Sequence, residues 1–158
     1  MPDESVDLVV TSPPYNIGIN YGTYRDTSKR SDFIRWCHEW AAEVHRLLKP
    51  GGSFFLNLGS APKNPLLPHQ LILALTEESP TFILQNTFHW IKSITINTRK
   101  GEEISAGHFK PINSKRFVND CHEYIFHLTK SGDVPLQRRE AGVTYADKSN
   151  IKRWAHTG

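Results

Sequence analysis

The chain has 158 residues, of which 38% are hydrophobic and 22% are charged, and its formal net charge is +3. No apolar run approaches the roughly 18 residues that a membrane span needs, so the composition predicts one globular domain and argues against a membrane protein. The start of the chain has neither a basic leader nor an apolar export segment, and Cys37 and Cys121 have no paired spacing, so we expect a cytoplasmic protein without disulfides.

The first predicted element is a short, β-branched and apolar strand over residues 6–11. It runs into Ser12-Pro13-Pro14, where a strand must end because proline donates no backbone hydrogen bond. Residues 15–30 lack periodicity, and a loop of that length is usually functional or mobile. A helix should follow, with Ser31 as its N-cap and with apolar residues at three-four spacing until Pro50-Gly51-Gly52 ends it.

The rest of the chain continues the alternation of strands and helices. Residues 53–58 predict a second buried strand, residues 66–78 a second helix, and residues 88–91 and 123–129 two further strands. This order predicts an α/β fold with a mainly parallel sheet and helices on its faces. We expect the domain to end near residue 132 and residues 133–158 to form a polar tail.

The candidate site is Ser12-Pro13-Pro14-Tyr15, because ligands of open α/β sheets bind outside the carboxyl ends of the strands. Consecutive prolines fix φ near about −65° and remove two amide donors, so the carbonyl oxygens of Ser12 and Pro13 point outward as acceptors. Two acceptors that hold the N–H bonds of an exocyclic base amine would direct its lone pair toward a methyl donor. Tyr15 offers an aromatic face to a base taken out of the stack. The simpler alternative is a proline-rich turn after a strand.

The motif and its surroundings resemble the amino-methylating DNA methyltransferases, whose signature is Asp/Asn/Ser-Pro-Pro-Tyr after a strand of a Rossmann-like sheet. Residues 6–16 resemble the strand and catalytic loop of that family, and Leu47-Leu48-Lys49-Pro50-Gly51-Gly52 resembles its helix-to-strand turn. Trp90-Ile91-Lys92 and residues 117–124 are similar to the segment that forms the wall of the target-base pocket. The resemblance covers roughly residues 3–132 and implies a partial Rossmann-like methyltransferase domain.

By this resemblance the enzyme transfers a methyl group from S-adenosylmethionine to double-stranded DNA by base flipping, without a covalent intermediate. The roles it implies are carried over to the residues that match. The catalytic residues would be Ser12, Pro13, Pro14 and Tyr15; the cofactor would contact Thr11 and Asn16; the base pocket or DNA would contact Trp90, Lys92, Phe117 and His122. For His122-Glu123, a polar pair that merely opens a strand is the alternative.

Serine before Pro-Pro-Tyr is the form commoner in cytosine amino-methylases, so the resemblance favours cytosine, with adenine as the alternative. The same loop also serves methylases of RNA and of glutamine amides in proteins. A cytosine carbon-5 methylase is disfavoured, because that chemistry needs a nucleophilic cysteine in a Pro-Cys loop, and neither Cys37 nor Cys121 lies in one. The histidines are scattered without metal-ligand spacing, so we expect no metal site.

The sequence departs from the family at one motif. The Phe-x-Gly-x-Gly loop that holds the cofactor in this family does not occur in the 158 residues. We therefore expect a fragment, truncated at both ends, in which residues 1–132 are the catalytic part and residues 133–158 are the possible start of the target-recognition segment. The alternative of another class is an inactive DNA-binding or assembly module.

Overall fold

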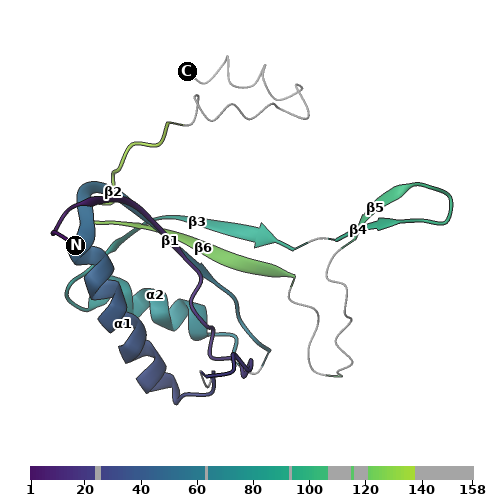
Figure 1. The fold of residues 1–158 in the computed structure, drawn as a ribbon, viewed down its shortest axis with the longest axis horizontal. Helices are drawn as coiled ribbons and strands as arrows, with labels where there is room; N and C mark the ends of the chain where they lie inside the picture. Colours follow the sequence, from purple (N-terminus) through teal and green to yellow (C-terminus); the bar gives the residue numbers. More distant parts are fainter. Residues whose placement is uncertain (24–25, 63, 93, 107–114, 116–120, 138–158) are drawn as a thin grey trace.

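The computed structural model describes residues 1–23, 26–62, 64–92, 94–106, 115 and 121–137. The expected contact at Phe117 and most of the polar tail, residues 138–158, lie outside these described residues. The elements, in chain order, are β1 (Val6–Thr11), α1 (Arg30–Leu47), β2 (Leu48–Leu58), α2 (Leu67–Glu77), β3 (Ile83–Ile91), β4 (Ile94–Asn97), β5 (Glu103–Ala106) and β6 (His122–Thr129). The α/β class is confirmed (Figure 1). No described helix is long and apolar enough to cross a membrane.

The main sheet has four strands in the order β1-β2-β6-β3. β1 pairs with β2 in parallel, whereas β6 is antiparallel to both of its neighbours, β2 and β3. β1, β2 and β3 therefore run in one direction, and β6 is inserted against them. The sheet is therefore mixed, which corrects the expectation of a mainly parallel sheet. Because β6 lies between β2 and β3 and runs against both, two of the three strand pairings in this sheet are antiparallel.

Both described helices cover the same face of this sheet (Figure 1). One buried apolar cluster joins them to the strands; among its members are Phe33, Cys37 and Ala41 of α1, Leu67, Leu71 and Leu75 of α2, Phe54, Leu56 and Leu58 of β2, and Phe126 and Leu128 of β6. The opposite face carries exposed apolar side chains, including Leu8, Val10, Phe88 and Trp90. The expectation of helices packed on the sheet is confirmed, and the structure adds that both described helices share one face, which three-four periodicity alone does not predict.

The first helix begins two residues earlier than predicted, at Arg30. Lys29 is the N-cap and makes no side-chain capping bond, so Ser31 lies inside the first turn and the expectation that it caps the helix is corrected. Asp32 in that turn complements the positive end of the helix. The apolar spacing did predict the buried side, where Phe33, Cys37 and Ala41 are each at most 1% exposed.

The second strand begins earlier than predicted, at Leu48. Pro50-Gly51-Gly52 lies within it rather than forming a helix-ending turn. Val6 pairs with Leu48 but Leu8 pairs with Ser53, so β2 bulges against β1 at these three residues. A bulge accommodates a proline because it leaves backbone groups outside the ladder.

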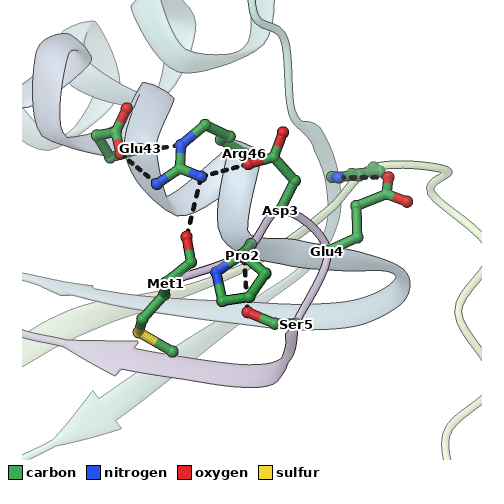
Figure 2. Close-up of polar contacts among 8 residues, drawn as sticks. Met1, Pro2, Asp3, Glu4, Ser5, Glu43 and Arg46 are labelled. Carbon is green, nitrogen blue, oxygen red and sulfur yellow. Dashed lines mark hydrogen bonds and ion pairs between the residues drawn. The ribbon is translucent and has the colours of Figure 1, made fainter.

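The N-terminal residues are tied to the end of α1 (Figure 2). The backbone N–H groups of Glu4 and Ser5 donate to the carbonyl oxygens of Arg46 and Leu47, at 3.0 and 2.9 Å. The Arg46 guanidinium donates to Glu43 at 2.8 Å and is also paired with Asp3. The two backbone bonds satisfy carbonyl groups that a helix otherwise leaves without partners at its C-terminal end. They fix residues 4 and 5, which immediately precede β1.

The second sheet was not predicted. β4 and β5 form a two-stranded antiparallel ribbon that extends away from the main sheet beyond the end of β3 (Figure 1). Gly101, at φ +77°, lies in the turn that joins its strands. The ribbon was missed because the short strand β4 follows β3 with almost no intervening turn signal in the sequence.

Candidate active site

A cavity of about 310 Å³ lies where β1, β2 and β3 end and β6 begins. This is the carboxyl edge of the three parallel-running strands, where the sequence placed the site. Its lining is Ser12, Pro13, Tyr15, Ile17, Ile19, Tyr21, Gly59, Ser60, Lys92, His122 and Glu123. The cavity therefore collects side chains from the loops after β1 and β2, from the end of β3 and from the start of β6.

The Ser-Pro-Pro-Tyr segment forms one wall. Ser12 is exposed, Pro13 is half-buried, and both line the cavity, whereas Pro14 is half-buried outside the lining. The ring of Tyr15 packs so closely on Gly59 that a Cβ there would lie 2.8 Å from a ring carbon. Glycine at the end of β2 is therefore what lets the Tyr15 ring sit in the wall of the cavity.

Tyr15 is the centre of a hydrogen-bond network. Its hydroxyl lies 2.6 Å from Ser12 Oγ and 3.3 Å from Glu123 Oε2. Asn57 Nδ2 donates to the Tyr15 hydroxyl at 2.7 Å and to Glu123 Oε2 at 2.8 Å. Burial raises the pKa of Tyr15, the Ser12 hydrogen bond opposes this, and the Glu123 charge adds to it, so the phenol stays protonated at neutral pH.

Glu123 provides the negative charge at the cavity. It is 8% exposed and forms an ion pair with Lys92, the residue after β3. Burial by itself would raise the pKa of Glu123, but hydrogen bonds from Lys92 and Asn57 outweigh it and hold the pKa below its usual value. Glu123 is therefore ionised at neutral pH; its Oε1 is paired with Lys92, whereas its Oε2 faces Tyr15 and Asn57.

The loop after the motif is held by a buried carboxylate. Asp26, 1% exposed, accepts the backbone N–H of Asn16 at 2.7 Å, of Ile17 at 3.0 Å and of Ile19 at 3.2 Å. Asn16 has φ +55°, which turns the chain immediately after Tyr15. This bracing places Ile17 and Ile19 in the cavity wall, so a loop without sequence periodicity is nevertheless ordered around one side chain.

The other residues expected at the site are distributed as follows. Lys92 and His122 line the cavity. Trp90 does not line the cavity: the residue is 51% exposed, and the centre of its ring lies 5.9 Å from the ammonium of Lys92, which does line it. Thr11 is the last residue of β1, and Asn16 lines a second cavity, of about 280 Å³, together with Asp26 and Asn64.

The sequence did not indicate two polar residues that hold the site in place, Asn57 of the Tyr15 network and Asp26 of the loop. Asn57 lies in an apolar strand, and Asp26 lies in a polar loop, so neither stood out locally. Glu123 had been left open between a pocket role and a strand-opening role, and its side chain lies in the pocket. A polar residue on the core-forming strand β2, where the pattern is otherwise Phe-Phe-Leu-x-Leu, is the signal that would have found Asn57.

The buried thiol agrees with the exclusion of carbon-5 chemistry. Cys37 has no exposed surface, and burial raises the pKa of its thiol to about 12. A thiol with that pKa supplies almost no thiolate nucleophile at neutral pH. Cys37 is an ordinary core residue of α1.

Comparison with known sequences then decides the family. The profile of the DNA methylase family matches residues 6–157. The chain belongs to the N6/N4 DNA methylase family. Type II methyltransferase M.MjaVI of Methanocaldococcus jannaschii is 43% identical over 158 residues, which are 99% of this chain and 76% of that protein. DNA adenine methyltransferase YhdJ of Escherichia coli K12 is 41% identical over 142 residues, 90% of this chain and 43% of that protein.

The fold comparison agrees with the family. The PvuII DNA methyltransferase, described as cytosine-N4-specific, superposes with a TM-score of 0.60 at 22% identity, over 83% of this chain and 44% of that one. At this identity the likeness shows the shared fold. This DNA methylase chain thus spans less than half the length of YhdJ and of the PvuII enzyme.

Proposed function

We propose that this DNA methylase transfers a methyl group to the exocyclic amino nitrogen of a base in double-stranded DNA, with cytosine as the first candidate. The observation that carries the proposal is the cavity in which Ser12, Pro13 and Tyr15 meet Glu123 at the carboxyl edge of the sheet. Its arrangement suits an amine that must be held by acceptors while its lone pair stays free.

The target base would enter this cavity after leaving the DNA stack. A duplex hides the amine in the groove, so an enzyme that acts on it must extrude the nucleotide. Tyr15 and Tyr21 line the cavity with aromatic rings, and stacking of a base on such a ring contributes about 1–3 kcal/mol. Phe117, expected to stack on the base, remains part of the proposal from the family resemblance.

The motif would activate the amine by holding it. Ser12 Oγ and the Pro13 carbonyl are the acceptors proposed for the two N–H bonds, and the rigid Pro-Pro pair keeps them in place. The methyl group would pass directly to nitrogen, without a covalent enzyme intermediate. The acceptors are electron-rich and neutral, so they hold the amine without removing its lone pair from reaction.

S-adenosylmethionine is the proposed cofactor, and when bound it supplies an electrophilic methyl group on a sulfonium ion. The cavity fits the reactive end of such a cation, because it presents the Glu123 carboxylate and the ring and hydroxyl of Tyr15, and Lys92 is already paired with Glu123. Thr11, which ends β1, and Asn16, which lines the second cavity, are the other proposed contacts of the cofactor. The side-chain oxygen of Asn16 is buried and has no hydrogen-bond partner among the described residues, so it is open to a donor.

An experiment can distinguish whether cytosine or adenine is the target base. Ser12 before Pro-Pro-Tyr favours cytosine, whereas the likeness to YhdJ, a DNA adenine methyltransferase, favours adenine as the second candidate. Labelled S-adenosylmethionine and the full protein that carries this sequence are incubated with duplexes in which only cytosine, or only adenine, has an exocyclic amine available for methylation. We expect label in the cytosine duplex. Label in the adenine duplex alone would reverse the order of the two candidates, and salt-dependent DNA binding with no label in either would indicate a binding module instead.

A further inference from the structure

Ser12, the first residue of the motif, cannot by itself accept the proton that the proposed reaction releases. In the proposed reaction the amine nitrogen becomes positively charged as it gains the methyl group, so it must release a proton. Ser12, unlike a carboxylic acid residue at this position, is too weak a base to keep that proton. The described cavity contains one carboxylate, Glu123, which lies within hydrogen-bond distance of Tyr15 and not of Ser12.

We propose that Glu123 is the terminal proton acceptor of the methyl transfer, reached from the target amine through the hydroxyls of Ser12 and Tyr15; this rests on the proposed function. The path consists of Ser12 Oγ and Tyr15 Oη at 2.6 Å, then Tyr15 Oη and Glu123 Oε2 at 3.3 Å. The contact at 3.3 Å is long for two oxygens, as catalytic hydrogen bonds often are before a substrate binds.

The partners fix the direction of each hydrogen bond. An ionised carboxylate only accepts, so Tyr15 donates its one proton to Glu123. The amide Nδ2 of Asn57 only donates, and it occupies one acceptor position of the Tyr15 oxygen at 2.7 Å. Ser12 must then donate to the remaining position on that oxygen. Asn57 Nδ2 also approaches Ser12 Oγ, at 3.4 Å, and this arrangement leaves the other lone pair of Ser12 Oγ available to accept an N–H bond from a base in the cavity.

The transfer balances along this path. The amine nitrogen forms its bond to the methyl carbon while the bond from that carbon to the donor sulfur breaks, and the electron pair stays on sulfur. The amine proton passes to Ser12 Oγ, the Ser12 proton to the oxygen of Tyr15, and the Tyr15 proton to Glu123 Oε2. Glu123 ends as a neutral carboxylic acid, and both hydroxyls are restored.

The acid strengths suit this direction. A methylated and protonated base amine is a much stronger acid than a carboxylic acid, because the ring withdraws its electrons. The lowered pKa of Glu123, in which hydrogen bonds from Lys92 and Asn57 overcome the effect of burial, therefore does not prevent proton uptake. The lowered pKa ensures instead that the Glu123 carboxylate is deprotonated at neutral pH and can accept a proton. Lys92, which is paired with Glu123 at the cavity wall, holds the carboxylate toward Tyr15.

The test compares Glu123→Gln and Tyr15→Phe in single-turnover methyl transfer by the full protein that carries this sequence. Each change keeps the shape of the side chain and interrupts the relay at a different atom. We expect each to slow transfer by about 100-fold or more near neutral pH, as loss of a proton acceptor does. The double variant should be no slower than the slower single one, because a relay fails as a unit. Glu39→Gln, on the exposed side of α1, should have no effect.

A second measurement distinguishes proton transfer from mere support of the pocket. The rate of methyl transfer is measured between about pH 6 and 9. For the unmodified protein it should not change with pH in the lower part of this range. For Glu123→Gln it should rise with pH, because solvent must then accept the proton. A lost structural support would lower the rate by the same factor at every pH. Fluorescence of a duplex with 2-aminopurine at the target position, without the methyl donor, should be unchanged in Glu123→Gln, showing that the base still enters.

The outcomes separate the two proposals. If the unmodified protein methylates no DNA, both the proposed function and the relay are overturned. If it methylates DNA while Glu123→Gln stays within about threefold, or while the two single effects add in the double variant, only the relay is overturned. A pH-independent loss in Glu123→Gln likewise assigns Glu123 a supporting role and overturns the relay.

Discussion

The helix-covered face of the sheet and its carboxyl edge are built from the same strands, yet they differ in almost every property. On the covered face, Phe54, Leu56 and Phe126 are at most 4% exposed and touch apolar neighbours. At the edge, Tyr15, Asn57 and Glu123 are joined by hydrogen bonds around a cavity. The strands obtain their stability from apolar burial along their length, so polar groups at their ends are free to serve chemistry.

The largest expected effect tests the covered face. Phe54 packs between Trp40 and Phe82 with no exposed surface, so Phe54→Ala should lower the free energy of unfolding by about 3–5 kcal/mol. Urea denaturation measures the loss. Phe55→Ala is the matched control, because Phe55 is the next residue on the opposite, partly open face and should cost clearly less. Equal losses would show that the two faces do not differ as described.

The next effect tests the carboxyl edge without replacing a polar side chain. A Cβ at Gly59 would meet the Tyr15 ring at 2.8 Å and Glu123 Oε1 at 3.2 Å, so Gly59→Ala must displace the Tyr15 hydroxyl from its partners. We expect methyl transfer to fall by about 100-fold, as misplacement of reacting groups by about 1 Å does. Gly51→Ala, on the same strand with no atom within 4 Å of the added carbon, should retain full rate. An unaffected Gly59→Ala enzyme would show that the position of the Tyr15 hydroxyl is unimportant.

A smaller effect is expected where the edge continues into the loop. Asp26→Asn replaces a carboxylate that accepts three backbone N–H groups with an amide that has one acceptor oxygen, so buried donors lose partners at a cost of about 1–3 kcal/mol. Hydrogen exchange should become faster at the amides of Ile17 and Ile19. Asp32→Asn, in an exposed pair with Arg35, is the control and should leave those amides unchanged. Unchanged exchange in Asp26→Asn would mean that the loop is ordered by other contacts.

The smallest effect is a pH dependence of stability on the open face. Burial lowers the pKa of His127, whose ring accepts from Asn86 at Nδ1 and donates to Ser53 at Nε2, an arrangement of the neutral imidazole. Because the folded pKa lies below the unfolded value of about 6.5, the unfolded chain takes up the proton first as the pH falls. The stabilisation is therefore complete above about pH 6.5 and decreases as the pH falls toward the folded pKa.

Unfolding free energies measured from about pH 7.5 down to about pH 5.5 should show this decrease in the unmodified chain. His127→Gln should make the curve flatter in this window, because it removes the group whose pKa is lowered by burial. A slope unaffected by His127→Gln would assign the pH dependence to another group.

The sequence by itself determined the local features of this DNA methylase. The bounds of β1, the buried side of α1 and the Ser-Pro-Pro-Tyr corner at a strand end follow from β-branched runs, three-four spacing and the missing amide of proline, all of which act between near neighbours in the chain. The edge of the sheet that these features indicated is the one at which the structure has a cavity.

Only the tertiary structure decided which distant residues meet there. Glu123 is 108 residues from Tyr15, and it reaches the Tyr15 hydroxyl because β6 enters the sheet antiparallel between β2 and β3. Strand order and direction depend on pairing between segments far apart in the chain, and no periodicity in either segment encodes them. The Ser-Pro-Pro-Tyr motif was thus readable from sequence, while the carboxylate that meets Tyr15 was placed by the insertion of one strand.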